Sequence, residues 1–138
     1  MEQPFDRREE AAVQAAVTDA GFEELAPLKD LRLLNLSRTR LTNAAMKEVA
    51  RHEKLQYLFL EELPVTDAVL KELAPLTDLR GLYFGGLRGF DGKNVTDAGL
   101  NELARFKKLE RLIVGGSSVT EAGMAALKEA LPKCNISH

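Results

Sequence analysis

The chain has 138 residues, the length of a single domain, and its 45% hydrophobic content is that of a folded protein. Its 19 basic and 21 acidic side chains give a net charge of −2, which argues against a general binder of nucleic-acid phosphates. A single cysteine excludes an internal disulfide, and no stretch approaches the roughly 18 apolar residues that a membrane-spanning helix needs. The charged N-terminus lacks the apolar run of a secretory signal, so we expect a cytoplasmic protein.

Residues 1–16 are predicted to form an N-terminal cap, with a helix over residues 5–16. Asp6 and Glu9 have the spacing of a capping box, and the alanines that follow supply an apolar surface to cover the first unit. A bare first strand would expose unpaired backbone groups. Because this helix would not hide the strand fully, a weak homodimer through the terminal strand is left open.

A hexapeptide of the form Val-Thr-Asp-Ala-Gly-Leu then recurs, with starts 24, 24, 30 and 24 residues apart. Its threonine is placed as a helix N-cap, and the acidic residue that usually follows suits the positive end of the helix dipole. Apolar residues three apart predict one buried helical stripe. The first half of each unit is therefore predicted to be helical. The units start at Val17, Leu41, Val65, Val95 and Val119, and the N-caps are Thr18, Thr42, Thr66, Thr96 and Thr120.

The second half of a unit carries a Leu-x-x-Leu-x-Leu pattern. Its last two apolar residues are two apart, which is strand periodicity, so both point inward and the residues between them point outward. A period of 20–29 residues with this core is typical of a leucine-rich solenoid. The sets are Leu31, Leu34 and Leu36, then Leu55, Leu58 and Leu60, then Leu79, Leu82 and Phe84, then Leu109, Leu112 and Val114.

On these motifs the units resemble the leucine-rich repeats of the Val-Thr-Asp-Ala-Gly-Leu type, common in bacterial and notably planctomycete proteins, and similar to the cysteine-containing repeats of F-box proteins. The match covers residues 17–136. The resemblance implies an α/β fold, a right-handed β-α superhelix with parallel strands on the concave face and helices on the convex face, over residues 17–138. Two departures are His52, where other units have Leu or Phe, and an insertion of about six residues near 87–94.

The outward strand positions are the best candidates for a binding site. An exposed sheet face normally carries polar residues, but here large apolar and aromatic residues should be neighbours. An aromatic patch rimmed by arginine has the composition of a protein-binding hot spot. The alternative is cross-strand packing that only stabilises the sheet. The predicted contact residues are Leu33, Asn35, Tyr57, Phe59, Tyr83 and Ile113, with Arg80 and Arg111 as polar partners.

The insertion is a second candidate, because loops often carry function. It would follow the third strand and could fold over the concave rim, with Arg88 and Phe90 as its contact residues. The alternative is a tolerated insertion in a surface turn, which costs little entropy. Gly92-Lys93 is not a phosphate loop, because Leu87 and Asn94 stand where that motif needs Gly and Ser or Thr.

No catalytic or metal-binding set is evident. His52 is expected to be a partly buried, hydrogen-bonded core residue, and Cys134 a small apolar residue under the C-terminal end. We therefore predict a non-enzymatic protein–protein interaction module that binds a protein or peptide on its concave face, without cofactor, metal, nucleic acid or membrane. The alternatives are a regulatory subunit or substrate adaptor of an enzyme, of the ubiquitin-ligase or GTPase-activator kind, and a structural assembly unit.

Overall fold

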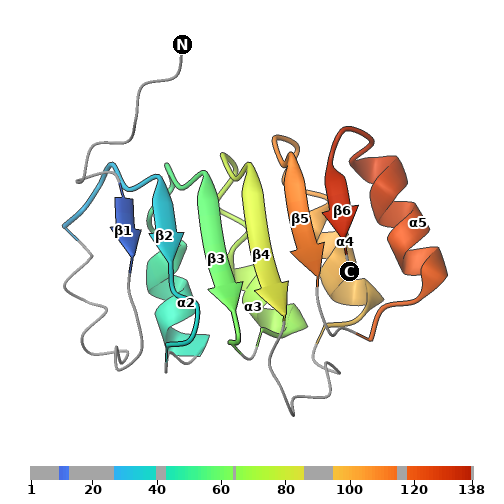
Figure 1. Ribbon diagram of the computed structural model, residues 1–138, viewed down its shortest axis with the longest axis horizontal. Helices are drawn as coiled ribbons and strands as arrows, with labels where there is room; N and C mark the ends of the chain where they lie inside the picture. The colour runs from blue at the N-terminus through green and yellow to red at the C-terminus, as the bar shows by residue number, and fades with distance from the viewer. Residues whose placement is uncertain are drawn as a thin grey trace.

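The computed structural model describes residues 10–12, 27–39, 43–63, 65–85, 95–114 and 118–137. These residues form one parallel sheet of six strands in chain order, with helices α2 to α5 on one side of it (Figure 1). The predicted α/β leucine-rich repeat solenoid is confirmed. The strands are β1 (Glu10–Ala12), β2 (Leu33–Asn35), β3 (Tyr57–Glu61), β4 (Gly81–Gly85), β5 (Arg111–Val114) and β6 (Asn135–Ser137), and the helices are α2 (Asn43–Val49), α3 (Asp67–Glu72), α4 (Asp97–Leu103) and α5 (Glu121–Ala130).

The N-terminal segment differs from its prediction. Glu10–Ala12 form β1, which pairs in parallel with β2, so the predicted capping helix is wrong over these three residues. Alanine favours helices, but a sheet edge offers hydrogen-bond partners to an extended segment, and such tertiary pairing overrides local propensity. The other residues of the 1–16 segment, and the predicted boundary at residue 17, lie outside the described residues.

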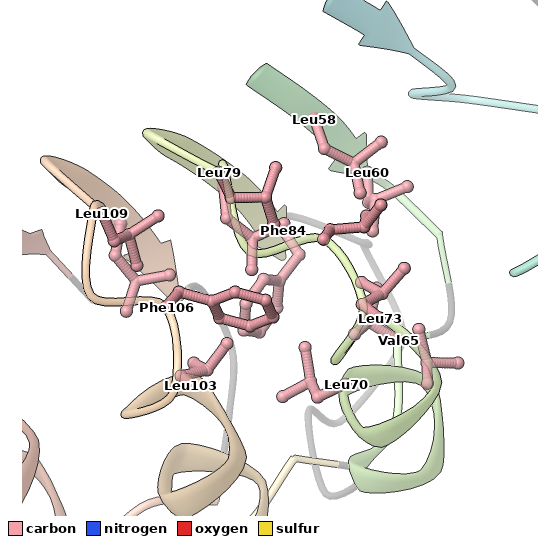
Figure 2. Packing of buried hydrophobic residues seen from close by; sticks show 14 of the residues in the cluster. Leu58, Leu60, Val65, Leu70, Leu73, Leu79, Phe84, Leu103, Phe106 and Leu109 are labelled. Atoms are coloured by element: carbon pink, nitrogen blue, oxygen red, sulfur yellow. The ribbon is translucent and has the colours of Figure 1, made fainter. Parts of the chain in front are cut away.

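The core is a stack of equivalent positions. The inward residues at the second position of β2 to β5 are paired in register, and none of them has any exposed surface. Those two residues later are at most 2% exposed. Figure 2 shows leucines of the strands and helices, such as Leu60, Leu70 and Leu103, packed near Phe84 and Phe106. Each unit thus buries its apolar residues against the next. The two inward rows are Leu34, Leu58, Leu82 and Leu112, and Leu36, Leu60, Phe84 and Val114.

The threonine N-caps are confirmed in the three units where the cap is described. Thr66, Thr96 and Thr120 have extended backbones, and each hydroxyl oxygen accepts a hydrogen bond, 3.0 to 3.3 Å long, from a backbone N–H two or three residues later. This satisfies one of the N–H groups left without a partner at a helix start. Thr18 and Thr42 lie outside the described residues.

Asp67 and Asp97 connect consecutive helices, in addition to the favourable position near the helix dipole expected from the sequence. The carboxylate of Asp67 accepts hydrogen bonds from the backbone N–H and the hydroxyl of Thr96, at 2.8 and 2.6 Å. Asp97 accepts the same two bonds from Thr120, at 2.9 and 2.6 Å. Each acidic side chain therefore holds the N-cap of the next unit.

Two helical glycines make room for these carboxylates. A β-carbon at Gly99 would collide with Oδ1 of Asp67, and one at Gly123 would collide with the carboxylate of Asp97. Glycine inside a helix costs about 1 kcal/mol relative to alanine, so its recurrence needs such a reason. Aspartate in one unit and glycine in the next thus form a single structural feature.

His52 is buried, with 4% of its surface exposed, and its Nδ1–H donates to the backbone carbonyl of Leu28 at 3.1 Å. The equivalent positions in the next two units are the fully buried Leu76 and Phe106. Burial lowers the pKa of His52, although the hydrogen bond to Leu28 opposes this effect. The expected hydrogen-bonded core histidine is confirmed.

Candidate functional site

The face of the sheet turned away from the helices, which we call the open face, carries two rows of outward-pointing side chains. Buried and exposed residues alternate along β2, β3 and β5, as the sequence predicted. Parallel strands lie about 4.8 Å apart, so residues in one row are neighbours. The first row, in register, is Leu33, Tyr57, Gly81 and Arg111, and the second is Asn35, Phe59, Tyr83 and Ile113.

The open face therefore brings together the predicted strand residues. The three aromatic side chains of Tyr57, Phe59 and Tyr83 are partly exposed and lie on the side away from the helices. Ile113 is 39% exposed, a large value for an isoleucine in a sheet. Leu33 and Asn35 are partly exposed at the other end of the rows, and Arg111 is exposed. Their role in binding a partner stays a prediction.

Phe59 and Tyr83 form an aromatic stack across β3 and β4. Their ring centroids are 4.6 Å apart and the ring planes differ by 8°. Such a pair contributes about 0.5–1.5 kcal/mol beyond the area that it buries. The stack thus stabilises the sheet, in agreement with the alternative of cross-strand packing, and it also gives the open face a rigid aromatic centre.

Gly81 is the residue that lets both tyrosines lie against the sheet. A β-carbon at Gly81 would lie 2.8 Å from the hydroxyl oxygen of Tyr83 and 2.9 Å from Cδ1 of Tyr57. The two rings therefore occupy the space that a side chain would take, and Gly81 is buried beneath them. Sequence analysis did not select Gly81, although it is the one small residue in a row of large ones.

The partly buried side chain of Tyr83 lies near the charged side chain of Arg111. Burial raises the pKa of Tyr83, the positive charge of Arg111 lowers it, and the nearby Tyr57 raises it, with burial the largest effect. The net direction is upward, so the phenol keeps its proton at neutral pH. Tyr83 is thus a neutral hydrogen-bonding group beside the Arg111 guanidinium.

The two predicted arginines differ in their surroundings. Arg80, just before β4, forms an ion pair with Glu110, with Nη2 and Oε1 3.6 Å apart. Within the described part of the chain Arg111 forms no ion pair, and its side chain projects from the first row beside Gly81. Arg111 is therefore the better placed of the two to meet a charged ligand on the open face.

The turns that follow β2 and β3 contain left-handed residues. Arg38 and Glu62 have φ angles of 64° and 60°, and their side chains pair, with Nε and Oε2 3.3 Å apart. The backbone N–H of Arg38 donates to the carbonyl of Glu61 at 3.0 Å, which links the two turns. A left-handed conformation is uncommon for residues other than glycine, and sequence analysis missed these turns. They form the rim at the C-terminal ends of the strands.

The second candidate, the insertion at 87–94 with Arg88 and Phe90, lies outside the described residues. The described residues contain no cluster of histidine, cysteine and carboxylate side chains that could hold a metal ion. Cys134 is partly buried against the core, and burial raises the pKa of its thiol, so it is not an activated thiolate. None of the helices in the described ranges combines the length and apolar composition of a membrane-spanning segment.

Comparison with known proteins supports the repeat architecture. No protein-family model and no curated protein matches this sequence. Among solved structures, the chain is similar to a leucine-rich repeat protein of Leptospira interrogans, with a TM-score of 0.54 and 25% sequence identity over 83% of this chain. The chain spans only 27% of the length of that protein. The similarity indicates a leucine-rich repeat relationship.

Proposed function

We propose that this protein is a non-enzymatic interaction module that binds a protein or peptide partner on the open face. The observation that carries the proposal is the aromatic patch of Tyr57, Phe59 and Tyr83, held in two registered rows on the side of the sheet opposite helices α2 to α5. Exposed aromatic residues around a rigid centre are typical of binding hot spots, since they bury a large area at a small cost in side-chain entropy.

The chemistry of the patch supports this function better than catalysis. Its rings and Ile113 offer apolar area, and Arg111 and the Tyr83 hydroxyl offer directional hydrogen bonds at the side. Regulation of an enzyme and structural assembly would use the same surface, so the identity of the partner distinguishes these alternatives. A partner that is a ligase subunit or a GTPase would favour regulation.

The test compares three forms of the protein in affinity purification from the cells that produce it. The first is the unchanged chain, the second carries Tyr57→Thr with Phe59→Thr, and the control carries Lys71→Ala with Glu72→Ala on the exposed surface of α3. Threonine keeps strand propensity while removing the rings. We expect the partner to be lost from the second form only.

Folding is measured in parallel by thermal unfolding. Loss of the aromatic stack should cost about 0.5–1.5 kcal/mol in addition to the area that the two rings bury, and because both rings are only partly buried, the variant should have a lower melting temperature but remain folded. A partner that remains bound to the Tyr57/Phe59 variant would contradict the proposal. Collapse of the fold in that variant would show that the patch is structural.

A further inference from the structure

The open face is positively charged in a chain of net charge −2. We consider, for each strand from β2 to β5, the residue before the first row and the residues of both rows. The charged residues among them are Arg32, Arg80, Arg111 and Glu110, and Glu61 lies on the same face at the end of β3, so three positive and two negative charges give +1. A surface whose sign opposes that of the whole chain favours a partner of negative charge.

Hydrogen-bond donors converge around Gly81. The hydroxyl of Tyr83 lies 2.8 Å from the place of a β-carbon on Gly81, and the ring of Tyr57 borders the same point from β3. Arg111 on β5 is the register partner of Gly81 on β4, so its side chain leaves the neighbouring strand on the same face of the sheet. Arg111 is exposed and forms no ion pair within the described residues.

Apolar surface lies directly beside these donors. Ile113 pairs with Tyr83 in the second row, and the far side of Tyr83 is covered by Phe59. A ligand that reaches Arg111 therefore also meets Ile113 and the edge of the aromatic stack. Guanidinium groups bind carboxylates through parallel N–H···O bonds, which a compact ammonium group cannot reproduce.

From this arrangement we infer that Arg111 and the Tyr83 hydroxyl, next to Tyr57 and above Gly81, bind the side-chain carboxylate of an aspartate or glutamate in the partner polypeptide. Phe59 and Ile113 contact an apolar residue beside that acidic one. The inference rests on the proposed function, and it adds the chemical class of the partner.

Among the residues that the structure describes, no acidic side chain pairs with Arg111. Glu110 pairs with Arg80 rather than with Arg111.

The experiment selects random peptides displayed on phage against the intact chain and against three variants. Arg111→Gln removes the charge, and Tyr83→Phe removes the hydroxyl while keeping the aromatic stack. Lys128→Gln is the matched control, because it removes one positive charge from an exposed position on α5. The chain has two tyrosines and no tryptophan, so tyrosine fluorescence reports on the patch in every variant.

We expect peptides enriched in aspartate or glutamate next to an apolar residue. A selected peptide, amidated at its C-terminus, should bind Arg111→Gln about tenfold more weakly and Tyr83→Phe a few-fold more weakly, because both lose hydrogen bonds to a charged group. Binding to Lys128→Gln should be unchanged. Replacing the acidic residue of the peptide by its amide should remove most of the difference between the intact chain and Arg111→Gln.

Each other outcome overturns the inference and is distinguishable. Neutral or basic peptides that bind the intact chain but not the form with Tyr57→Thr and Phe59→Thr would support the proposed function and exclude the carboxylate site. Absence of any peptide enrichment would contradict both. Equal competition by an oligothymidylate would show general attraction of anions rather than a carboxylate site, as would equal weakening in Lys128→Gln.

Discussion

Replacing Gly99 by alanine should destabilise this protein, although the same change in most helices stabilises it. Gly99 lies inside α4, where alanine is favoured over glycine by about 1 kcal/mol. In this helix the new β-carbon would collide with Oδ1 of Asp67 and would lie 3.1 Å from Cδ1 of Leu70. The Asp67 carboxylate must therefore move away from the N-terminus of α4.

The cost follows from the bonds that Asp67 loses. It accepts two hydrogen bonds from Thr96, at 2.8 and 2.6 Å. Hydrogen bonds to charged groups contribute about 1.5–3 kcal/mol each, and both residues are partly exposed, so the lower value applies. A loss of about 3 kcal/mol, offset by about 1 kcal/mol of helix propensity, leaves a net destabilisation of about 2 kcal/mol. The melting temperature should then fall by roughly 5–10 °C.

The assay is a double-mutant cycle followed by thermal and urea unfolding. Asp67→Ala removes the carboxylate that meets the new β-carbon, so in that background Gly99→Ala should become neutral or stabilising, by up to about 1 kcal/mol. The sign of the effect therefore reverses between the two backgrounds. A higher melting temperature for Gly99→Ala alone would refute the reasoning, as would equal destabilisation in both backgrounds.

Three further substitutions test other parts of the structure. The pKa of His52 is lowered in the folded state, so its contribution to the free energy of unfolding is fully present above the unfolded value of 6.5 and declines as pH falls below it. His52→Leu should therefore reduce the fall in melting temperature between neutral and mildly acidic pH. An unchanged fall would contradict this prediction. The Thr120 hydrogen bonds lower the pKa of Asp97, so its contribution to stability is present above the unfolded pKa of 3.8 and is lost as pH falls through the pKa of the folded state. Asp97→Asn should therefore make acid unfolding less steep. An identical acid profile would exclude the effect. Gly81→Ala should shift tyrosine fluorescence, because the new β-carbon would displace both rings from their positions over Gly81. Both tyrosines are partly exposed and can move toward solvent, so stability should change by less than about 1 kcal/mol. An unaltered spectrum would show that the rings do not cover Gly81.

Much of the fold was predictable because the same pattern of residues recurs in every unit, so the structure inferred for one unit applies to the others. Leu34, Leu58 and Leu82 recur at 24-residue intervals, and a spacing of two between inward residues has only one simple structural meaning. The outward position of Tyr57, Phe59 and Tyr83 follows from the same alternation. Equivalent sequence positions become equivalent positions in space, so the sequence was enough to place these residues on one face.

The N-terminal segment shows where this logic ends. Glu10–Ala12 contain two alanines and lie before the first hexapeptide, so local propensity was the only guide and it indicated a helix. In the structure the segment adds a strand to the edge of the sheet. Backbone pairing with β2 supplies hydrogen bonds whatever the side chains are, so the residue types of this segment do not reveal that it forms a strand.

Within residues 31–114, the sequence by itself determined the order of the elements, the two faces of the sheet and the residues on each, because all three depend on periodicity along the chain. Only the tertiary structure decided the contacts between units: the Asp67 carboxylate beside Gly99, the Phe59–Tyr83 stack and the two tyrosines over Gly81. Except for Tyr83 and Gly81, which lie two residues apart on β4, these contacts join residues about one repeat apart, and all of them depend on side-chain directions in three dimensions. The physical reason is that a repeat specifies which residues become neighbours, whereas packing specifies how the neighbours touch.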